Sequence, residues 1–88
     1  MDKKSVIEFP CQFPIKVMGV KHDDLIPEVV AIISAQVHDF NPELDIVIKP
    51  SSKGNYLSIT AMINAKSQEQ LDNIYRALNK HVLVKITL

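Results

Sequence analysis

The segment Tyr56-Leu57-Ser58-Ile59-Thr60-Ala61-Met62-Ile63-Asn64 alternates between apolar and mostly polar residues along its whole length. Side chains of a β-strand point alternately to the two faces of a sheet, so a period of two indicates a strand with one buried face. The pattern predicts a strand over residues 56–64 that buries the side chains at positions 57, 59, 61 and 63. The opposite face, with Tyr56, Ser58 and Thr60, is expected to be open to solvent or to a partner.

The residues before this segment predict a hairpin. Leu44, Ile46 and Ile48 alternate with residues of the other face, which indicates a strand over 44–49. The connection, Pro50-Ser51-Ser52-Lys53-Gly54-Asn55, is a dense run of residues that favour turns. We therefore expect the two strands to pair as an antiparallel hairpin that buries one face.

Two amphipathic helices flank this hairpin. Asp24 is the predicted N-cap of the first helix, and Pro27 is tolerated there because the N–H groups of a first turn lack intrahelical partners. The apolar stripe predicts that this helix continues to Asn41-Pro42, and its members are Ile26, Val29, Val30, Ile33, Val37 and Phe40. Ser67 and Gln70 have the spacing of a capping box, which begins a second helix that closes at 79–81.

Strands over 13–20 and 82–88 complete the pattern. The resulting order, βαββαβ, predicts an α+β fold, the ferredoxin-like sandwich, with a four-stranded antiparallel sheet and both helices on one face. Strands 13–20 and 56–64 are expected to be central. The last strand is expected to form a long apolar edge in which Val82, Val84, Ile86 and Leu88 share one face.

Length and composition limit the possible functions. The chain has 88 residues and a formal net charge of zero, which predicts a single domain over 13–88 preceded by an N-terminal arm over 1–12. A neutral chain is not expected to bind nucleic acid, because affinity for phosphates comes from clustered Lys and Arg. No apolar run is long enough for a signal peptide or a membrane span, and the single Cys11 forms no internal disulfide, so we expect a cytoplasmic protein.

The sequence lacks the residues with which other proteins of this fold bind metals, oxyanions or RNA. One cysteine and three histidines far apart in sequence make no metal-ligand pattern, so no metal, cofactor or catalytic residue is predicted. The single arginine, Arg76, lies in the middle of a predicted helix, which disfavours an arginine clamp for oxyanions. RNA-binding sheets present two or three aromatic residues, whereas Tyr56 is the one expected on this open face.

Two turns are candidate ligand or interaction sites. The first offers hydroxyl, lysine and glycine groups that could cradle a small anion, and its residues are Ser51, Ser52, Lys53, Gly54, Asn55 and Tyr56. Its spacing is not that of a phosphate-binding loop. The alternative is structural: Gly54 supplies a positive φ while the serines and Asn55 satisfy backbone groups. The second candidate is the turn from Gly19 to Asp24, with the same alternative.

Three runs together resemble the YbeD-like family of small uncharacterised bacterial proteins: Glu8-Phe9-Pro10, Lys16-Val17-Met18-Gly19, and Lys49-Pro50-Ser51-Ser52-Lys53-Gly54-Asn55-Tyr56 before Ser58. The resemblance covers nearly the whole chain. It implies a domain similar to ACT regulatory domains, which bind amino acids or other small effectors near the turn from the first strand to the first helix and pair through their sheets. Gly19 and Asp24 occupy that turn here, without the usual Pro-Gly pair. The resemblance implies no established reaction, and gene neighbourhoods in the family point toward lipoate metabolism.

These observations favour a small regulatory or protein-interaction module over an enzyme. An uncovered apolar edge such as 82–88, which only Lys85 interrupts, invites pairing with another strand. We therefore expect a homodimer, formed by edge pairing or across the open sheet face, or a complex with another protein. The alternative is an ACT-like domain that binds a small-molecule or anion effector. Neither a membrane nor a nucleic-acid partner is expected.

Overall fold

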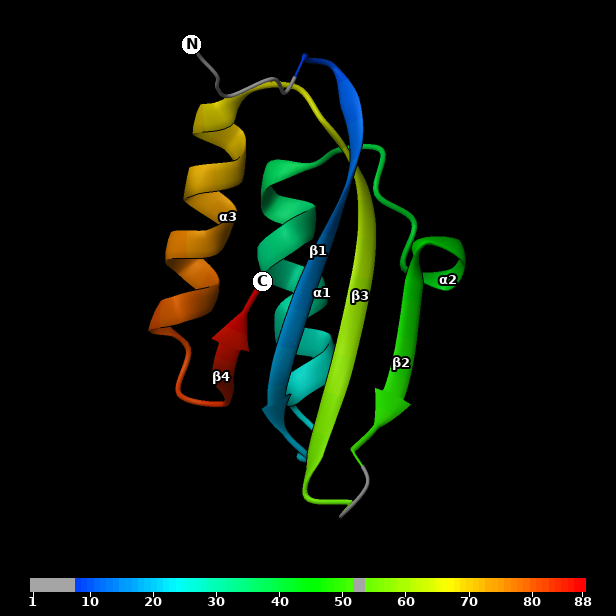
Figure 1. The fold of residues 1–88 in the computed structure, drawn as a ribbon, viewed down its shortest axis with the longest axis vertical. Helices are drawn as coiled ribbons and strands as arrows, with labels where there is room; N and C mark the ends of the chain where they lie inside the picture. Colours follow the sequence, from blue (N-terminus) through cyan, green and yellow to red (C-terminus); the bar gives the residue numbers. More distant parts are fainter. Residues whose placement is uncertain (1–7, 52–53) are drawn as a thin grey trace, which may run out of the picture.

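The computed structural model describes residues 8–51 and 54–88, and these form one four-stranded antiparallel sheet with two long helices (Figure 1). In chain order the elements are β1 Cys11–Val20, α1 Leu25–Gln36, α2 Pro42–Asp45, β2 Ile46–Pro50, β3 Tyr56–Ala65, α3 Gln68–Lys80 and β4 Val84–Thr87. The strand order is β2-β3-β1-β4, so β1 and β3 are central. The predicted α+β ferredoxin-like sandwich is therefore confirmed.

Both long helices pack on the same face of the sheet. In Figure 1, α1 and α3 lie side by side, and α1 passes behind β1 and β3. Ile59, Ala61 and Ile63 are buried, whereas the residues between them point to the other face, as the alternation predicts. A single apolar core results, and its buried members are Ile15, Val17, Leu25, Val29, Ile33, Val37, Ile59, Ala61, Ile63, Ala65, Leu71, Ile74, Leu78 and Val84.

The first helix is shorter than predicted. It ends at Gln36, because Val37 has extended backbone (φ −125°, ψ 106°), although the buried Val37 still donates its N–H to the Ile33 carbonyl. Asn41 begins a new helical turn: its side chain accepts the Glu43 N–H at 3.0 Å, and Pro42 follows it. An Asn-Pro pair of this kind starts a helix as readily as it stops one.

This extra turn also moves the second strand. Because α2 extends to Asp45, β2 begins at Ile46 and not at Leu44. Leu44 was predicted to share a strand face with Ile46 and Ile48, but it lies in α2 and is 79% exposed. None of the described helices has the length and apolar character needed to cross a membrane.

The last strand differs from its prediction in length and in face. β4 covers Val84–Thr87 only, with Val84 opposite Gly19 and Ile86 opposite Met18, and the register shifts between these pairs. An extra residue in one strand changes which face the following side chains occupy. Val84 is therefore buried, whereas Ile86 is 51% exposed on the other face. The predicted common face of Val84 and Ile86 is wrong, and the edge is shorter than expected.

Gln70 joins the two long helices at their ends. Ser67 Oγ accepts the Gln70 N–H at 3.1 Å, as the capping-box spacing predicts. The Gln70 side chain accepts the Lys66 N–H at 2.7 Å and donates to the Gln36 carbonyl at 2.8 Å. Since Gln36 is the last residue of α1, one side chain satisfies backbone groups at the start of α3 and at the end of α1.

Replacing Gln70 with alanine is expected to lower the free energy of unfolding by about 1–3 kcal/mol, because two backbone groups lose their partners. Urea denaturation measures the change. The control is Glu69→Ala, one residue earlier and exposed, with an expected change below about 0.5 kcal/mol. Equal unfolding midpoints for Gln70→Ala and Glu69→Ala would show that the Gln70 contacts do not stabilise the fold.

Candidate functional site

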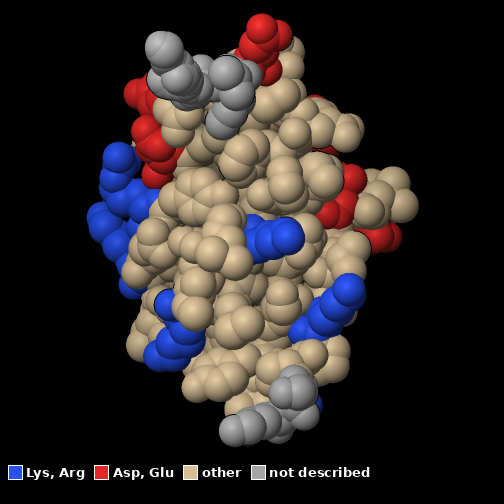
Figure 2. All heavy atoms as spheres, viewed as in Figure 1, with Lys and Arg blue, Asp and Glu red and all other residues tan. Residues whose placement is uncertain are grey.

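The sheet face that the helices leave uncovered is the main candidate interaction surface. Strand register and alternation place a common set of side chains on it, which we call the open face: Lys16, Met18, Val47, Lys49, Tyr56, Ser58, Thr60, Met62, Ile86 and Leu88. Leu88 belongs to it because Leu88 and Lys16 exchange two backbone hydrogen bonds of 2.8 and 3.2 Å. Figure 2 shows this face as mostly uncharged atoms with separate basic groups, while the acidic atoms lie toward the margins.

Apolar side chains dominate the open face. Met18 is 37% exposed, Val47 55% and Leu88 75%. A shallow hollow of about 110 Å³ is bordered by Lys16, Met18, Ser58, Ile86 and Leu88. Single exposed apolar residues are common on proteins, but a contiguous set on one face is typical of an interaction surface. The sequence predicted that this face is open, but it understated its apolar character because Ile86 reaches it only through the irregularity in β4.

The structure brings the two predicted candidate turns together at one end of the sheet. The Lys21 N–H donates to the Asn55 carbonyl at 3.0 Å, and Val20 lies opposite Tyr56. Val20 and Lys21 therefore neighbour Tyr56 and Asn55, although 36 and 34 positions separate the members of these pairs in the sequence. Nothing in the local spacing of either turn indicates this proximity.

The described polar groups of the 51–56 turn hold the turn itself. Gly54 has a φ of 76°, in the region that favours glycine, and donates its N–H to the Ser51 carbonyl at 3.0 Å. Ser51 Oγ accepts the Tyr56 N–H at 3.3 Å. Ser52 and Lys53 lie outside the described residues. These contacts account for Ser51 and Gly54 structurally, and an anion site in this turn stays a prediction.

Gly19 serves the packing of the end of β1. A Cβ at this position would lie 2.6 Å from Leu25 Cδ1 and 2.7 Å from the Leu83 carbonyl oxygen. Leu25 is completely buried. The inner side of the turn from β1 to α1 is thus filled by side-chain and backbone atoms of this chain.

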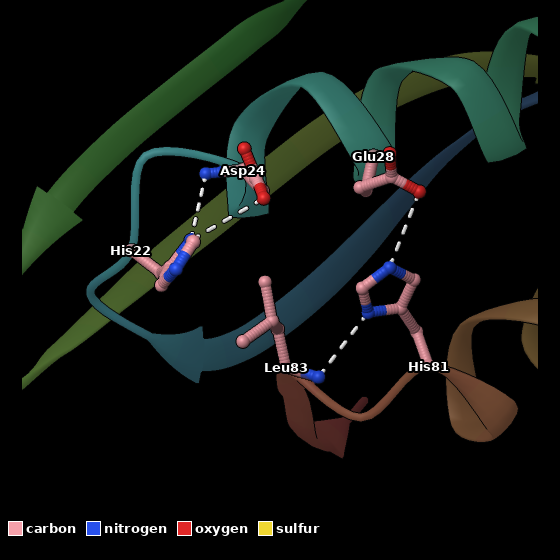
Figure 3. Close-up of polar contacts among 5 residues, drawn as sticks. All are labelled: His22, Asp24, Glu28, His81 and Leu83. Atoms are coloured by element: carbon pink, nitrogen blue, oxygen red, sulfur yellow. Dashed lines mark hydrogen bonds and ion pairs between the residues drawn. The ribbon is translucent and has the colours of Figure 1, made fainter.

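Asp24 lies at the start of α1 beside His22 (Figure 3). It is the N-cap of α1, as predicted, although its carboxylate makes no capping hydrogen bond. Its backbone N–H donates to His22 Nδ1 at 3.0 Å, and its carboxylate lies 3.8 Å from the same nitrogen. Both side chains are largely exposed, so this contact contributes little to stability.

His81 connects the loop before β4 to α1 (Figure 3). Its Nδ1 accepts the Leu83 N–H at 3.2 Å, and its Nε2 lies 3.2 Å from Glu28 Oε1. Since Nδ1 accepts, the neutral ring carries its proton on Nε2 and donates it to Glu28. The sequence gives no local signal for a contact between residues 53 positions apart. Across residues 8–51 and 54–88, no cluster of three or more His, Cys, Asp or Glu side chains could hold a metal ion.

A wider hollow of about 590 Å³ lies at the other end of β1. Its lining is Pro10, Cys11, Gln12, Asp39, Asn64 and Lys66. The Asn64 side-chain amide donates to Asp39 Oδ2 at 2.9 Å, and this hydrogen bond lowers the pKa of the exposed Asp39 carboxyl below its ordinary value. Cys11 is half-buried and belongs to no disulfide.

Comparison with protein families gives a match over nearly the whole chain. A family model described as a protein of unknown function (DUF493) matches residues 4–88. The chain belongs to this family. A UPF0250 protein of Janthinobacterium sp. (strain Marseille) is 48% identical over 97% of this chain and 92% of its own length. One from Neisseria gonorrhoeae is 47% identical over 99% of this chain and 94% of its own length. The resemblance to the YbeD-like family is confirmed.

Solved structures of two proteins share the fold. Protein HP0495 from H. pylori superposes with a TM-score of 0.77 and 16% identity, covering 98% of this chain and 89% of that one. The ACT domain of the GTP pyrophosphokinase from Chlorobium tepidum superposes with a TM-score of 0.62 and 19% identity, covering 88% of this chain and 94% of the domain. At these identities the likeness is one of fold, and it confirms the ACT-like architecture that the sequence resemblance implied.

Replacing Gly19 with alanine is expected to lower the free energy of unfolding by about 1–3 kcal/mol, because the Leu83 backbone carbonyl cannot move away as easily as a flexible side chain. Urea denaturation measures the loss. Gly54→Ala is the comparison, since nothing lies within 4 Å of a Cβ there and any loss comes from its positive φ alone. A Gly19→Ala protein as stable as the unmodified chain would contradict the packing role.

Replacing Asn64 with alanine is expected to raise the pKa of Asp39, because its hydrogen bond to the carboxylate is removed. Carboxyl-carbon NMR titration reads this pKa directly. A pKa lowered in the folded state contributes stability that is present above the unfolded value and is lost as the pH falls through the folded value. The stability of the Asn64→Ala variant should therefore fall less than that of the unmodified chain as the pH is lowered through the folded pKa of Asp39. Gln12→Ala, in the same hollow, should leave the pKa of Asp39 unaltered, and an equal shift in both variants would count against Asn64 as the cause.

Proposed function

We propose that this chain is a small, non-enzymatic interaction module that receives a partner protein on its open face. The observation that carries the proposal is the apolar character of that uncovered face, to which every strand contributes: Met18 from β1, Val47 from β2, Met62 from β3 and Ile86 from β4. Removing apolar surface from water is the main favourable term in most protein associations. A face that gathers exposed apolar side chains from all four strands is the surface of this chain that gains most from a partner.

The ACT-like fold supports a regulatory use of such a module. The ACT domain to which the chain is similar is part of a GTP pyrophosphokinase, which is an enzyme. By analogy of fold alone, we propose that this chain acts on a separate target protein by docking to it.

Two alternatives have less support. An effector site beside Gly19 has little support, because Leu25 and the Leu83 carbonyl already occupy the space next to this glycine. An enzyme is expected to hold strongly shifted titratable groups in a cleft. Two described groups have shifted pKa values. Asp39 borders the 590 Å³ hollow, but it is exposed, and the hydrogen bond from Asn64 lowers its pKa. Burial raises the pKa of Tyr75, whose hydroxyl donates to the Leu88 carbonyl, so neither group combines burial with a place in a cleft.

A photo-crosslinking residue at Thr60 is expected to form a covalent adduct with one discrete protein when the full chain is expressed in its native cells. Thr60 lies between Lys16 and Val47 in the middle of the open face, so a docked partner must pass within reach of it. Electrophoresis and mass spectrometry identify the adduct. The matched control places the same residue at Asp72, on the exposed side of α3, where this adduct should be absent.

A second control combines the crosslinking residue at Thr60 with the substitution Ile86→Glu. Ile86 is half exposed, so the substitution should leave the unfolding midpoint nearly unchanged while it weakens docking and removes the adduct. Identical adducts from positions 60 and 72, or none from position 60, would contradict the proposed function. A raised unfolding temperature with amino acids, nucleotides or lipoate, and no adduct, would favour the effector-site alternative.

A further inference from the structure

The charged residues of the sheet are all basic. The four strands contain Lys16, Lys49 and Lys85 and no aspartate or glutamate, although the whole chain balances 10 Lys and Arg against 10 Asp and Glu. The described acidic residues lie on the helices, in the turns or before β1. None of them lies within ion-pair distance of Lys16 or Lys49. An electrically neutral chain therefore presents a face that is both apolar and basic (Figure 2).

Lys16 and Lys49 are spaced so that one short segment can contact both. Lys16 lies opposite Thr60 and Lys49 opposite Ser58, on the two sides of β3. With strands about 4.8 Å apart and a rise of about 3.3 Å per residue, the two lysine Cα atoms lie roughly 12 Å apart. Met18 lies beside this diagonal, and the hollow bordered by Ile86 and Leu88 adjoins Lys16.

These charges disfavour a second copy of the chain on the open face. A two-fold interface places the same surface patch of each protomer against the other. Lysines of both copies would then share one partly dehydrated interface to which no described side chain of either open face brings a carboxylate. Like charges in such an interface repel strongly and select against that partner.

Single-stranded RNA is another anionic partner to consider. It is disfavoured because the side chains around the two lysines are mostly not aromatic. Sheets that bind RNA stack several bases on aromatic rings. Among the described residues of the open face, Tyr56 is the one aromatic, and aliphatic and methionine side chains occupy the remainder of its apolar area.

We propose that the occupant of the open face is an acidic, amphipathic segment of another protein; this inference rests on the proposed function and specifies its partner. The apolar side chains of the segment contact Met18, Ile86 and Leu88, and two of its carboxylates pair with Lys16 and Lys49. On an α-helix, residues seven apart are separated by about 10.5 Å along the axis, which matches the lysine spacing. Apolar contact supplies most of the affinity, while the ion pairs fix orientation and select the partner.

Selection from a displayed library of random peptides against the full chain tests this inference. We expect the enriched peptides to combine apolar residues with Asp or Glu about two helical turns apart. When the unmodified chain is titrated with a synthetic copy of an enriched peptide, the amide NMR signals of β1, β3 and β4 at the open face should shift. The double variant Lys16→Glu/Lys49→Glu should bind this peptide at least about ten-fold more weakly, since each lost pair is replaced by repulsion.

The matched control is Lys21→Glu/Lys80→Glu, which changes the net charge equally at two positions outside the strands and should keep the affinity of the unmodified chain. Amide spectra of both double variants establish that they fold. Peptides that bind the open face but carry no acidic residues, or that bind both double variants equally, would overturn this inference and leave the proposed function standing. If no selected peptide shifts the open-face amides and Thr60 gives no adduct, both fail.

Discussion

The antiparallel ladder between β1 and β3 is the constraint on which the rest of this structure depends. Its ten register pairs run without a break from Cys11–Ala65 to Val20–Tyr56, so the two central strands bury and expose matching alternate residues. A shift of one position would turn the apolar residues of one of the two strands toward water, either Ile15 of β1 or Ile59 of β3, both of which are completely buried. Since each long helix has one apolar stripe, the two helices can cover one face only, and the other face of the sheet stays bare.

That one-sided arrangement gives the chain a surface suited to association. Contact between the apolar open face and water is unfavourable, so covering this face with a partner lowers the free energy. Its side chains come from every strand, so it exists only in the folded sheet. The segregation of acidic residues to helices and turns adds a second property, a basic character within a neutral chain. Apolar area supplies affinity for a partner, whereas Lys16 and Lys49 supply a means of choosing it.

The end of the sheet near Gly19 shows why a family resemblance does not by itself locate a ligand. In this chain Leu25 and the Leu83 carbonyl occupy the space next to Gly19, and the glycine permits that close approach. His81 fixes the same region by joining the start of β4 to Glu28 on α1. Ser51, which looked suited to ligand binding in the sequence, instead holds its own turn together through Gly54 and Tyr56.

The sequence alone determined the presence and order of the four strands and the two long helices, and the buried face of β3, because periods of two and of about 3.6 are local properties of the chain. Local signals were ambiguous where one motif can serve two purposes. Asn41-Pro42 was interpreted as the end of the first helix, whereas in the structure it begins the separate helical turn α2. Only the tertiary structure decided which face Ile86 occupies, since the register shift arises from pairing with β1. It alone also brought Lys16 and Lys49 onto one face and His81 against Glu28, because those distances depend on how distant segments pack.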